Sequence, residues 1–305
     1  PSILYWVFPP GSNIGGLGAG LVRCVRPWNE WLCVWGYDIT KEPPTLDEEE
    51  AKRIVRKLVG IPDLEMEITG FSLWGNNEQW ATHMQNGRVF IAGDAAHRHP
   101  PSHGLGSNTS IQDSYNLAWK LAAVLKGQAG EDLLETYSVE RAPIAKQIVT
   151  RANNSSREYQ PIFDALGVSD ATTDEEFTEK LKLRKEATPE GAARRKALRQ
   201  ALDNKDFEFN AQGTEIGQFY QSTAVVCDGL GRPEVTEDPM LHHQKSTYPG
   251  LRLPHAWIGD TLTKASTHDI ATGTGFTLFT GINGRPWAEA AEEVAKSLGI
   301  ELKAV

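Results

Sequence analysis

The segment Arg88–Asn108 holds the residues whose types and spacing could do chemistry. A short apolar run, Arg88–Ala92, ends at Gly93 and Asp94, which predicts a buried strand of the parallel type with a carboxylate at its C-terminal end. Ligands bind at that edge of open α/β sheets, and a carboxylate can accept hydrogen bonds from sugar-like hydroxyls. We therefore expect Asp94 to bind a ligand rather than to cap a helix.

A loop rich in Pro and Gly follows this carboxylate. Pro100 and Pro101 stiffen the backbone and lack N–H donors, so we expect their carbonyls to be free to face a ligand. Four further residues form a turn into a helix: Gly104, Gly106, Ser107 and Asn108. The N-terminus of a helix carries unpaired N–H groups and about half a positive charge, which suits an anionic or electron-rich group.

Two histidines and three polar helix residues lie next to this loop. His97 and His99 near a carboxylate suggest a metal site, but a third ligand at suitable spacing does not follow. We therefore predict no metal and expect one histidine to anchor the loop. The polar residues Asp113, Asn116 and Lys120 are interpreted as a polar face or as helix contacts.

The pattern GDAAHxxPPxxGxGxN, followed by DxxNLAWKLA, resembles the second flavin-binding motif of the aromatic hydroxylases built on the p-hydroxybenzoate hydroxylase fold. In that family the Asp holds the ribityl chain of FAD, and the helix N-terminus faces the flavin edge that becomes negative on reduction. The resemblance implies a cofactor site of eight residues: Gly93, Asp94, Ala95, Pro101, Gly104, Gly106, Ser107 and Asn108. It also implies that the backbone carbonyl of Pro101 faces the substrate hydroxyl as a catalytic group.

Other segments resemble the phenol hydroxylase branch: YWVFPPG, GLGAGLVRCVRPWNEWLCVWGYD, ETYSVERAPIA, GQFYQSTAVVCDG and YPGLRLPHAWIGD. The likeness is greatest to bacterial 2,4-dichlorophenol 6-monooxygenases. It implies an enzyme that binds FAD, consumes NAD(P)H and O2, and hydroxylates a phenol, expected to be a chlorophenol, ortho to its hydroxyl through a C4a-hydroperoxide of the flavin. Resorcinol, a hydroxyphenylpropanoate or a polyketide phenol are the alternative substrates.

Two motifs of this family do not occur in the sequence: the first FAD motif, G-x-G-x-x-G, and the Asp-Gly motif. We expect the chain to begin after both, as a fragment cut at both ends, with the catalytic base outside it. The stretch Gly16–Gly20 lacks the spacing and the following helix of a dinucleotide motif, so it is interpreted as a loop of the substrate domain. A non-catalytic or interaction fragment is the alternative function.

The resemblance and the local patterns predict an α/β (α+β) chain of four parts. Residues 1–86 are expected to form mainly the substrate-domain sheet, and residues 87–227 the Rossmann-like FAD-binding motif and the helices after it. Residues 228–255 are expected to be a linker, and residues 256–305 the start of a thioredoxin-like domain without a CxxC pair.

Hydrophobic periodicity, together with the positions of Gly, Pro and capping residues, predicts the individual helices and strands. The expected strands are 3–8, 21–25 and 31–37 in an antiparallel meander, then 64–73, 275–282 and 301–305. The expected helices are one opened by a capping box at Thr45–Glu48, one over 108–126, one from 133, a charged helical stretch over 169–206, and one over 286–298. The buried face expected for the helix over 108–126 is Ile111, Tyr115, Ala118, Leu121, Ala122 and Leu125.

The composition indicates which kinds of partner the chain can bind. The formal net charge of −9 disfavours nucleic acid and anionic membrane surfaces, because both bind through excess Lys and Arg. Three cysteines without a CxxC spacing predict no disulfide framework, and the default location is therefore the cytoplasm. We expect a small phenolic substrate and O2 as partners, and a homo-oligomer.

Overall fold

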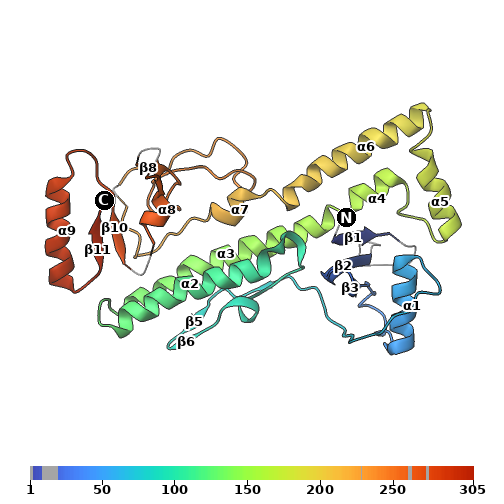
Figure 1. Cartoon of the computed structure of the whole chain (residues 1–305), viewed down its shortest axis with the longest axis horizontal. Coiled ribbons are helices and arrows are strands. Elements are labelled where there is room, and N and C mark those ends of the chain that lie inside the picture. Colours follow the sequence, from blue (N-terminus) through green and yellow to red (C-terminus); the bar gives the residue numbers. More distant parts are fainter. Residues whose placement is uncertain (1–2, 9–19, 228, 260–262, 273–274) are drawn as a thin grey trace. The chain divides into compact units, whose positions relative to one another are not determined.

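The computed structural model describes residues 3–8, 20–227, 229–259, 263–272 and 275–305 as a mixture of helices and short strands (Figure 1). Two compact units divide the chain. Pro1–Glu78 with Arg151–Phe209 form the first, and Gln79–Thr150 with Asn210–Val305 form the second.

The first unit opens with a three-stranded antiparallel sheet in the order β1-β2-β3. Its strands are β1 (Leu4–Val7), β2 (Gly20–Arg26) and β3 (Glu30–Val34). Val22 of β2 pairs with Tyr5 on one side and with Cys33 on the other, which confirms the predicted meander. Residues 11–19 lie outside the described residues, so the interpretation of Gly16–Gly20 as a loop stays a prediction except at Gly20, which begins β2.

Helix α1 (Glu48–Val59) packs on this sheet. A Cβ at Gly20 would lie 2.0 Å from Leu58 Cδ2, so a larger residue there would require the Leu58 side chain to shift. The predicted capping box at Thr45–Glu48 is wrong. Asp47 is the N-cap, and its carboxylate accepts a hydrogen bond of 2.8 Å from the backbone N–H of Glu50.

The strand predicted over 64–73 does not form. Leu64, Met66 and Ile68 are half-buried while the acids between them are exposed, so the alternation in burial is real. The segment is nevertheless irregular and pairs with no strand among the described residues. Alternation indicates which side chains face inward, but only a neighbouring strand can supply the ladder of hydrogen bonds.

Helices complete the first unit: α4 (Gln160–Leu166), α5 (Asp174–Leu183) and α6 (Pro189–Lys205), followed by a 3₁₀ turn, Asp206–Glu208. The predicted helical stretch is confirmed, and α6 begins after Thr188, whose hydroxyl accepts from the N–H of Gly191 at 3.1 Å. The core is aromatic, with Trp6 against Tyr159 at a centroid distance of 4.7 Å.

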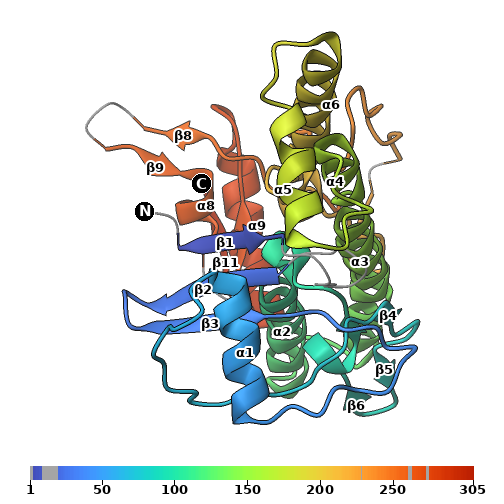
Figure 2. The same ribbon diagram turned by 90° about the vertical axis from the view of Figure 1, so that its right-hand side faces the viewer.

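The second unit is built around two adjacent helices, α2 (Leu105–Leu125) and α3 (Asp132–Arg157), the latter ending in the first unit. Two short helices, α7 (Gln212–Ile216) and α8 (Thr267–Ile270), follow. Its antiparallel strand pairs are β4 (Gln79–Trp80) with β7 (His97–Arg98), β5 (Gln85–Asn86) with β6 (Val89–Phe90), and β8 (Trp257–Ile258) with β9 (Ala265–Ser266). Figure 2 shows β8 and β9 side by side.

The parallel strand predicted over Arg88–Ala92 is wrong. Val89 and Phe90 form β6, which is antiparallel to β5, and the side chain of Val89 is 68% exposed. The reason is local: Gly87 adopts a left-handed φ of 57°, which reverses the chain and pairs the apolar run with the residues just before it.

The C-terminal residues form a strand–helix–strand unit, as predicted. Strands β10 (Phe276–Leu278) and β11 (Leu302–Ala304) are parallel, and helix α9 (Arg285–Leu298) connects them. The described part of 228–255 contains no helix or strand, and its interpretation as a linker stays a prediction.

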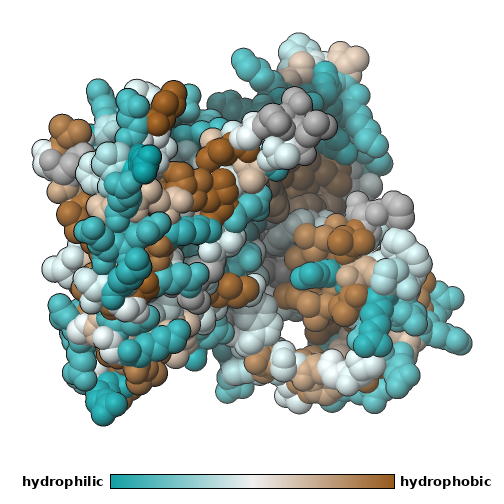
Figure 3. Space-filling model, turned by 60° about the vertical axis from the view of Figure 1, so that its left-hand side comes forward, coloured by the Kyte–Doolittle hydropathy of each residue, from teal (hydrophilic) through white to brown (hydrophobic). Residues whose placement is uncertain are grey.

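Apolar side chains are also found on the surface, and Figure 3 shows them in patches between hydrophilic residues on one face. No helix among the described residues is both long enough and apolar enough to cross a membrane.

The N-cap of α1 can be tested by substitution. Replacing Asp47 with Ala should lower the free energy of unfolding by about 1 kcal/mol, because the N–H of Glu50 loses its acceptor. Denaturant unfolding followed by circular dichroism measures this loss. Thr45→Ala is the control and should leave the unfolding midpoint unchanged. An equal loss of stability in the two variants would contradict the assignment of Asp47 as the N-cap and favour Thr45.

Candidate functional site

The carboxylate predicted to bind a ligand lies on a tight turn. Gly93–Ala95 forms a 3₁₀ turn in which Gly93 is buried, while Asp94 and Ala95 are exposed. Gly93 has a φ of 58°, and a Cβ at this position would lie 3.0 Å from Ser110 Oγ of α2. Glycine therefore suits this position, because the backbone has a left-handed φ and a larger residue would also crowd Ser110.

The predicted glycine-rich turn leads directly into α2. A second 3₁₀ turn, Ser102–Gly104, ends at Gly104, which has a φ of 62° and is the N-cap. No side chain caps this helix end. Gly104, Ser107 and Asn108 are exposed, and Asn108 Nδ2 donates to the Gly104 carbonyl at 2.8 Å. The N–H groups of the first turn are thus left for an electron-rich partner.

The two prolyl carbonyls are not free, contrary to expectation. His99 Nδ1 lies 2.7 Å from the Pro100 carbonyl oxygen, and the N–H of Gly104 donates to the Pro101 carbonyl at 3.1 Å. Each carbonyl oxygen has a second lone pair, so Pro101, which is exposed, can still accept one further hydrogen bond.

The carboxylate of Asp113, in α2, is hydrogen-bonded to the turn at Gly93. Its carboxylate is fully buried and accepts from Gly93 N at 3.1 Å, His97 Nε2 at 2.8 Å and Arg141 Nε at 2.7 Å. Burial alone would raise the pKa of Asp113, but the His97 hydrogen bond and the Arg141 charge outweigh it and hold the pKa below the ordinary value. Asp113 is therefore ionised at neutral pH, and His97 anchors the loop as one histidine was predicted to do.

The buried face of α2 is the reverse of the predicted one. Ile111, Tyr115 and Leu125 are 66%, 70% and 82% exposed. Ala118 is also exposed, and Leu121 and Ala122 are only half-buried. The buried residues of this helix are instead mostly polar: Leu105, Thr109, Asp113, Asn116 and Lys120.

The reason is the charged residues that α3 brings to the interface. Lys120 Nζ lies 2.7 Å from Glu140 Oε2, and Asn116 Nδ2 donates to the same oxygen at 2.8 Å. Lys120 and Glu140 are both buried, and burial lowers the pKa of Lys120 although Glu140 opposes the shift. The interpretation of Asp113, Asn116 and Lys120 as helix contacts is thus confirmed.

A further segment, Gln218–Ser222, crosses the same two helices, and we call it the strap. Arg141 Nη1 donates to Gln218 Oε1 at 2.8 Å and to the Tyr220 hydroxyl at 2.9 Å, and Ser222 Oγ donates to Glu140 Oε1 at 2.6 Å. The sequence interpretation missed Glu140, Arg141 and the strap as parts of the site. The adjacent charges in the otherwise apolar stretch Val139–Ala145 were the available signal.

Two ring nitrogens in this loop are buried without a hydrogen-bond partner among the described residues: His97 Nδ1 and His99 Nε2. The His99 ring lies beside Gly106, where a Cβ would sit 3.7 Å from His99 Cε1. The described residues contain no group of three or more His, Cys, Asp or Glu that could hold a metal ion. Unpaired polar atoms, an uncapped helix and an exposed carboxylate together fit a large polar cofactor.

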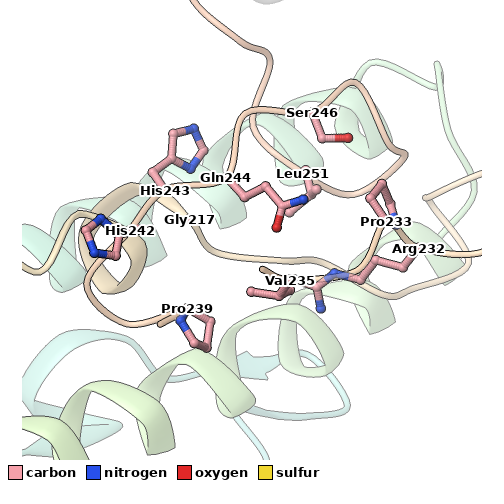
Figure 4. Close-up of a pocket in the computed structure, with 10 residues that line it drawn as sticks. All are labelled: Gly217, Arg232, Pro233, Val235, Pro239, His242, His243, Gln244, Ser246 and Leu251. Carbon is pink, nitrogen blue, oxygen red and sulfur yellow. The ribbon is translucent and has the colours of Figure 1, made fainter. Parts of the chain in front are cut away.

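A small pocket elsewhere in the second unit includes none of the eight predicted cofactor residues (Figure 4). Its walls come from the irregular segment 217–251 and include Arg232, His242 and His243. The surface around Asp94 is therefore the candidate site.

Comparison with known proteins identifies the family of the chain. The family described as FAD binding domain matches residues 1–152. A phenol 2-monooxygenase from Pseudomonas sp. (strain EST1001) is 75% identical over 283 residues, which cover 93% of this chain and 47% of that protein. A 2,4-dichlorophenol 6-monooxygenase from Cupriavidus pinatubonensis (strain JMP 134 / LMG 1197) is 52% identical over 303 residues, or 98% of this chain and 50% of that protein.

Solved structures show the same likeness. The flavin-dependent monooxygenase PieE, in complex with FAD and substrate, matches with a TM-score of 0.88 and 36% identity over 100% of this chain and 52% of that one. Aklavinone-11 hydroxylase, with FAD and aklavinone, matches with a TM-score of 0.68 and 26% identity over 99% of this chain and 51% of that one.

The chain belongs to the class of FAD-binding monooxygenases. Within that class the chain belongs to the branch of the phenol hydroxylases and 2,4-dichlorophenol monooxygenases. It spans about half the length of the curated relatives that it matches.

The protonation of the His99 imidazole can be tested by titration. Its imidazole should titrate below the ordinary pKa of 6.5, because burial and the neighbouring His97 outweigh the Pro100 hydrogen bond and the charge of Asp94. Protonation then favours the unfolded chain, so the stability contributed by this group is lost as the pH falls below 6.5. A histidine NMR titration, assigned with His99→Gln, measures the midpoint; a value at or above 6.5 would contradict the burial of the ring.

Proposed function

We propose that the gene product containing this chain is an FAD-dependent monooxygenase that uses NAD(P)H and O2 to hydroxylate a phenol ortho to its hydroxyl. The observation that carries the proposal is the 75% identity to a phenol 2-monooxygenase, across a chain that contains the GDAAHxxPPxxGxGxN pattern. A chlorophenol is the second candidate substrate, supported by the 52% identity to a 2,4-dichlorophenol 6-monooxygenase. The higher identity favours phenol itself or a simply substituted phenol.

Eight residues are proposed to hold FAD: Gly93, Asp94, Ala95, Pro101, Gly104, Gly106, Ser107 and Asn108. The exposed carboxylate of Asp94 would accept a hydrogen bond from a ribityl hydroxyl. The uncapped first turn of α2 would face the pyrimidine edge of the flavin. FAD, when bound, would supply the activation of O2 with electrons from NAD(P)H.

The chain's own contribution is electrostatic and positional. The N–H groups near Ser107 and Asn108 are fixed dipoles, and donors aimed in advance at developing negative charge are typically worth a few kcal/mol. The second lone pair of the Pro101 carbonyl is proposed to accept the hydroxyl of the phenol, which would orient the ring. The base that deprotonates the phenol is proposed to lie outside this chain.

The finer domain assignment belongs to the same proposal. Residues 87–227 would contribute the second flavin motif to a Rossmann-like domain, and residues 1–86 the substrate-domain sheet. The parallel β10–α9–β11 unit supports a thioredoxin-like start within 256–305. A cytoplasmic homo-oligomer remains part of the proposal.

The decisive experiment is NAD(P)H oxidation by the purified intact gene product across a panel of phenols. Phenol should stimulate oxidation most and yield the ortho-hydroxylated product, with 2,4-dichlorophenol, resorcinol, a hydroxyphenylpropanoate and a polyketide phenol as comparisons. Greatest stimulation and hydroxylation with 2,4-dichlorophenol would select the second candidate. No stimulation and no product with any phenol, in a protein that is folded, would overturn the proposal and favour a non-catalytic role.

Asp94→Ala in the intact gene product should weaken FAD binding. Loss of a charge-assisted hydrogen bond costs about 1.5–3 kcal/mol, which corresponds to roughly a ten- to hundredfold rise in the dissociation constant. Flavin fluorescence titration measures it. Glu131→Ala removes another exposed acid of the same unit and serves as the control; an unchanged constant for Asp94→Ala would remove Asp94 from the site.

Residues 1–305 alone should bind FAD weakly or not at all, because the G-x-G-x-x-G motif and the Asp-Gly motif do not occur in them. Equilibrium dialysis of the purified chain against FAD, beside the intact gene product, tests this. A yellow complex as tight as that of the intact product would show that the second motif suffices.

A further inference from the structure

The α2–α3 interface contains two buried ion pairs, Asp113–Arg141 and Lys120–Glu140. The four side chains are at most 4% exposed, and both ion pairs have a closest N···O distance of 2.7 Å. They join the same two helices and resemble each other in burial and geometry. The difference that concerns the site is that only Asp113 also bonds the loop that carries Asp94.

One oxygen atom fixes both ends of that loop. Asp113 Oδ2 accepts from Gly93 N at 3.1 Å and from His97 Nε2 at 2.8 Å, and Asp94 lies between these two residues. The other oxygen, Oδ1, accepts from Arg141 Nε at 2.7 Å. Both anchored residues are themselves buried: Gly93, which has a left-handed φ of 58°, and His97, which is 2% exposed.

We propose that Asp113 is a positioning residue for FAD, which sets the conformation of Gly93–His97 and thereby aims the Asp94 carboxylate at the cofactor. This inference rests on the proposed flavin function. Asp113 would act on the cofactor indirectly, through the loop, without contacting it.

Arg141 keeps the Asp113 carboxylate ionised, and the ionised form is the one that can position the loop. An ionised carboxylate only accepts hydrogen bonds, whereas the protonated acid would place an O–H against one of its three donors. Arg141 is in turn fixed by Gln218 and the Tyr220 hydroxyl of the strap, so its guanidinium stays against the carboxylate. The strap thus supports the loop through two successive contacts, although it does not bond the loop directly.

The competing explanation is that Asp113 only pairs the helices. The Lys120–Glu140 pair makes a matched control, because it contributes to the same interface without bonding the loop. We compare D113N/R141M with K120M/E140Q in the intact gene product. Each double variant removes one acid and one base, so the net charge is conserved in both.

Three measurements are made on each variant: the unfolding midpoint, the FAD dissociation constant by fluorescence titration, and the visible circular dichroism of bound flavin, which reports its orientation. D113N/R141M should raise the dissociation constant at least tenfold and alter the flavin dichroism. K120M/E140Q should lose comparable stability but keep the dissociation constant within about twofold and the wild-type dichroism.

A further variant, His97→Phe, covers the case in which D113N/R141M does not fold. It removes one of the two loop anchors and leaves both ion pairs in place. A several-fold weaker FAD complex with altered dichroism is expected. Wild-type values in His97→Phe, or equal FAD losses in the two double variants, would overturn the positioning role.

The wild-type protein separates this inference from the proposed function. If the wild type binds no FAD, the proposed function fails, and the inference fails with it. If the wild type binds FAD and oxidises NAD(P)H with phenol while the loop variants bind equally well, only the inference fails.

Discussion

The carboxylate of Asp113 is the interaction on which the second unit depends. It is buried with no exposure to water, and it accepts one hydrogen bond from a backbone turn, one from a histidine and one from a guanidinium. A buried charge without partners would be very costly, so the three donors must be held in place by the surrounding structure. The turn, the two helices and the strap are therefore linked through a single polar group.

This constraint explains why α2 packs by its polar face. Ion pairs buried between helices contribute little net stability over an apolar interface, because desolvation offsets the attraction. Their effect is to specify the register, since Asp113 must meet Arg141 and Lys120 must meet Glu140 at the same time. Removing one partner of such a pair typically costs roughly 3–5 kcal/mol, so alternative registers are disfavoured.

The same arrangement explains how a ligand loop can be both exposed and ordered. Asp94, Pro101, Gly104, Ser107 and Asn108, which are proposed to bind the cofactor, are all exposed. The order comes from the residues beneath them, namely the Asp113 carboxylate and the packing of the Gly93–Ala95 turn on α2. A site that is shaped before its ligand arrives loses less conformational entropy on binding.

Local sequence signals determined much of this protein. The meander of 3–37, the start of α6 at Thr188 and the parallel β10–α9–β11 unit were predictable, because each depends on residues close together in the chain or on strong periodicity. The motif around Asp94 likewise indicated the family to which the chain belongs. These features hold wherever the rest of the chain packs.

Only the tertiary structure decided which face of α2 is buried, which residue fixes the loop, and whether 64–73 and Arg88–Ala92 find strand partners. The apolar stripe of α2 predicted burial of Ile111 and Tyr115, but the charged residues of α3, distant in sequence, made the opposite face the interface. A sequence shows which side chains are apolar. It does not show which distant charge a buried polar group will meet, and that pairing determines whether its burial is possible.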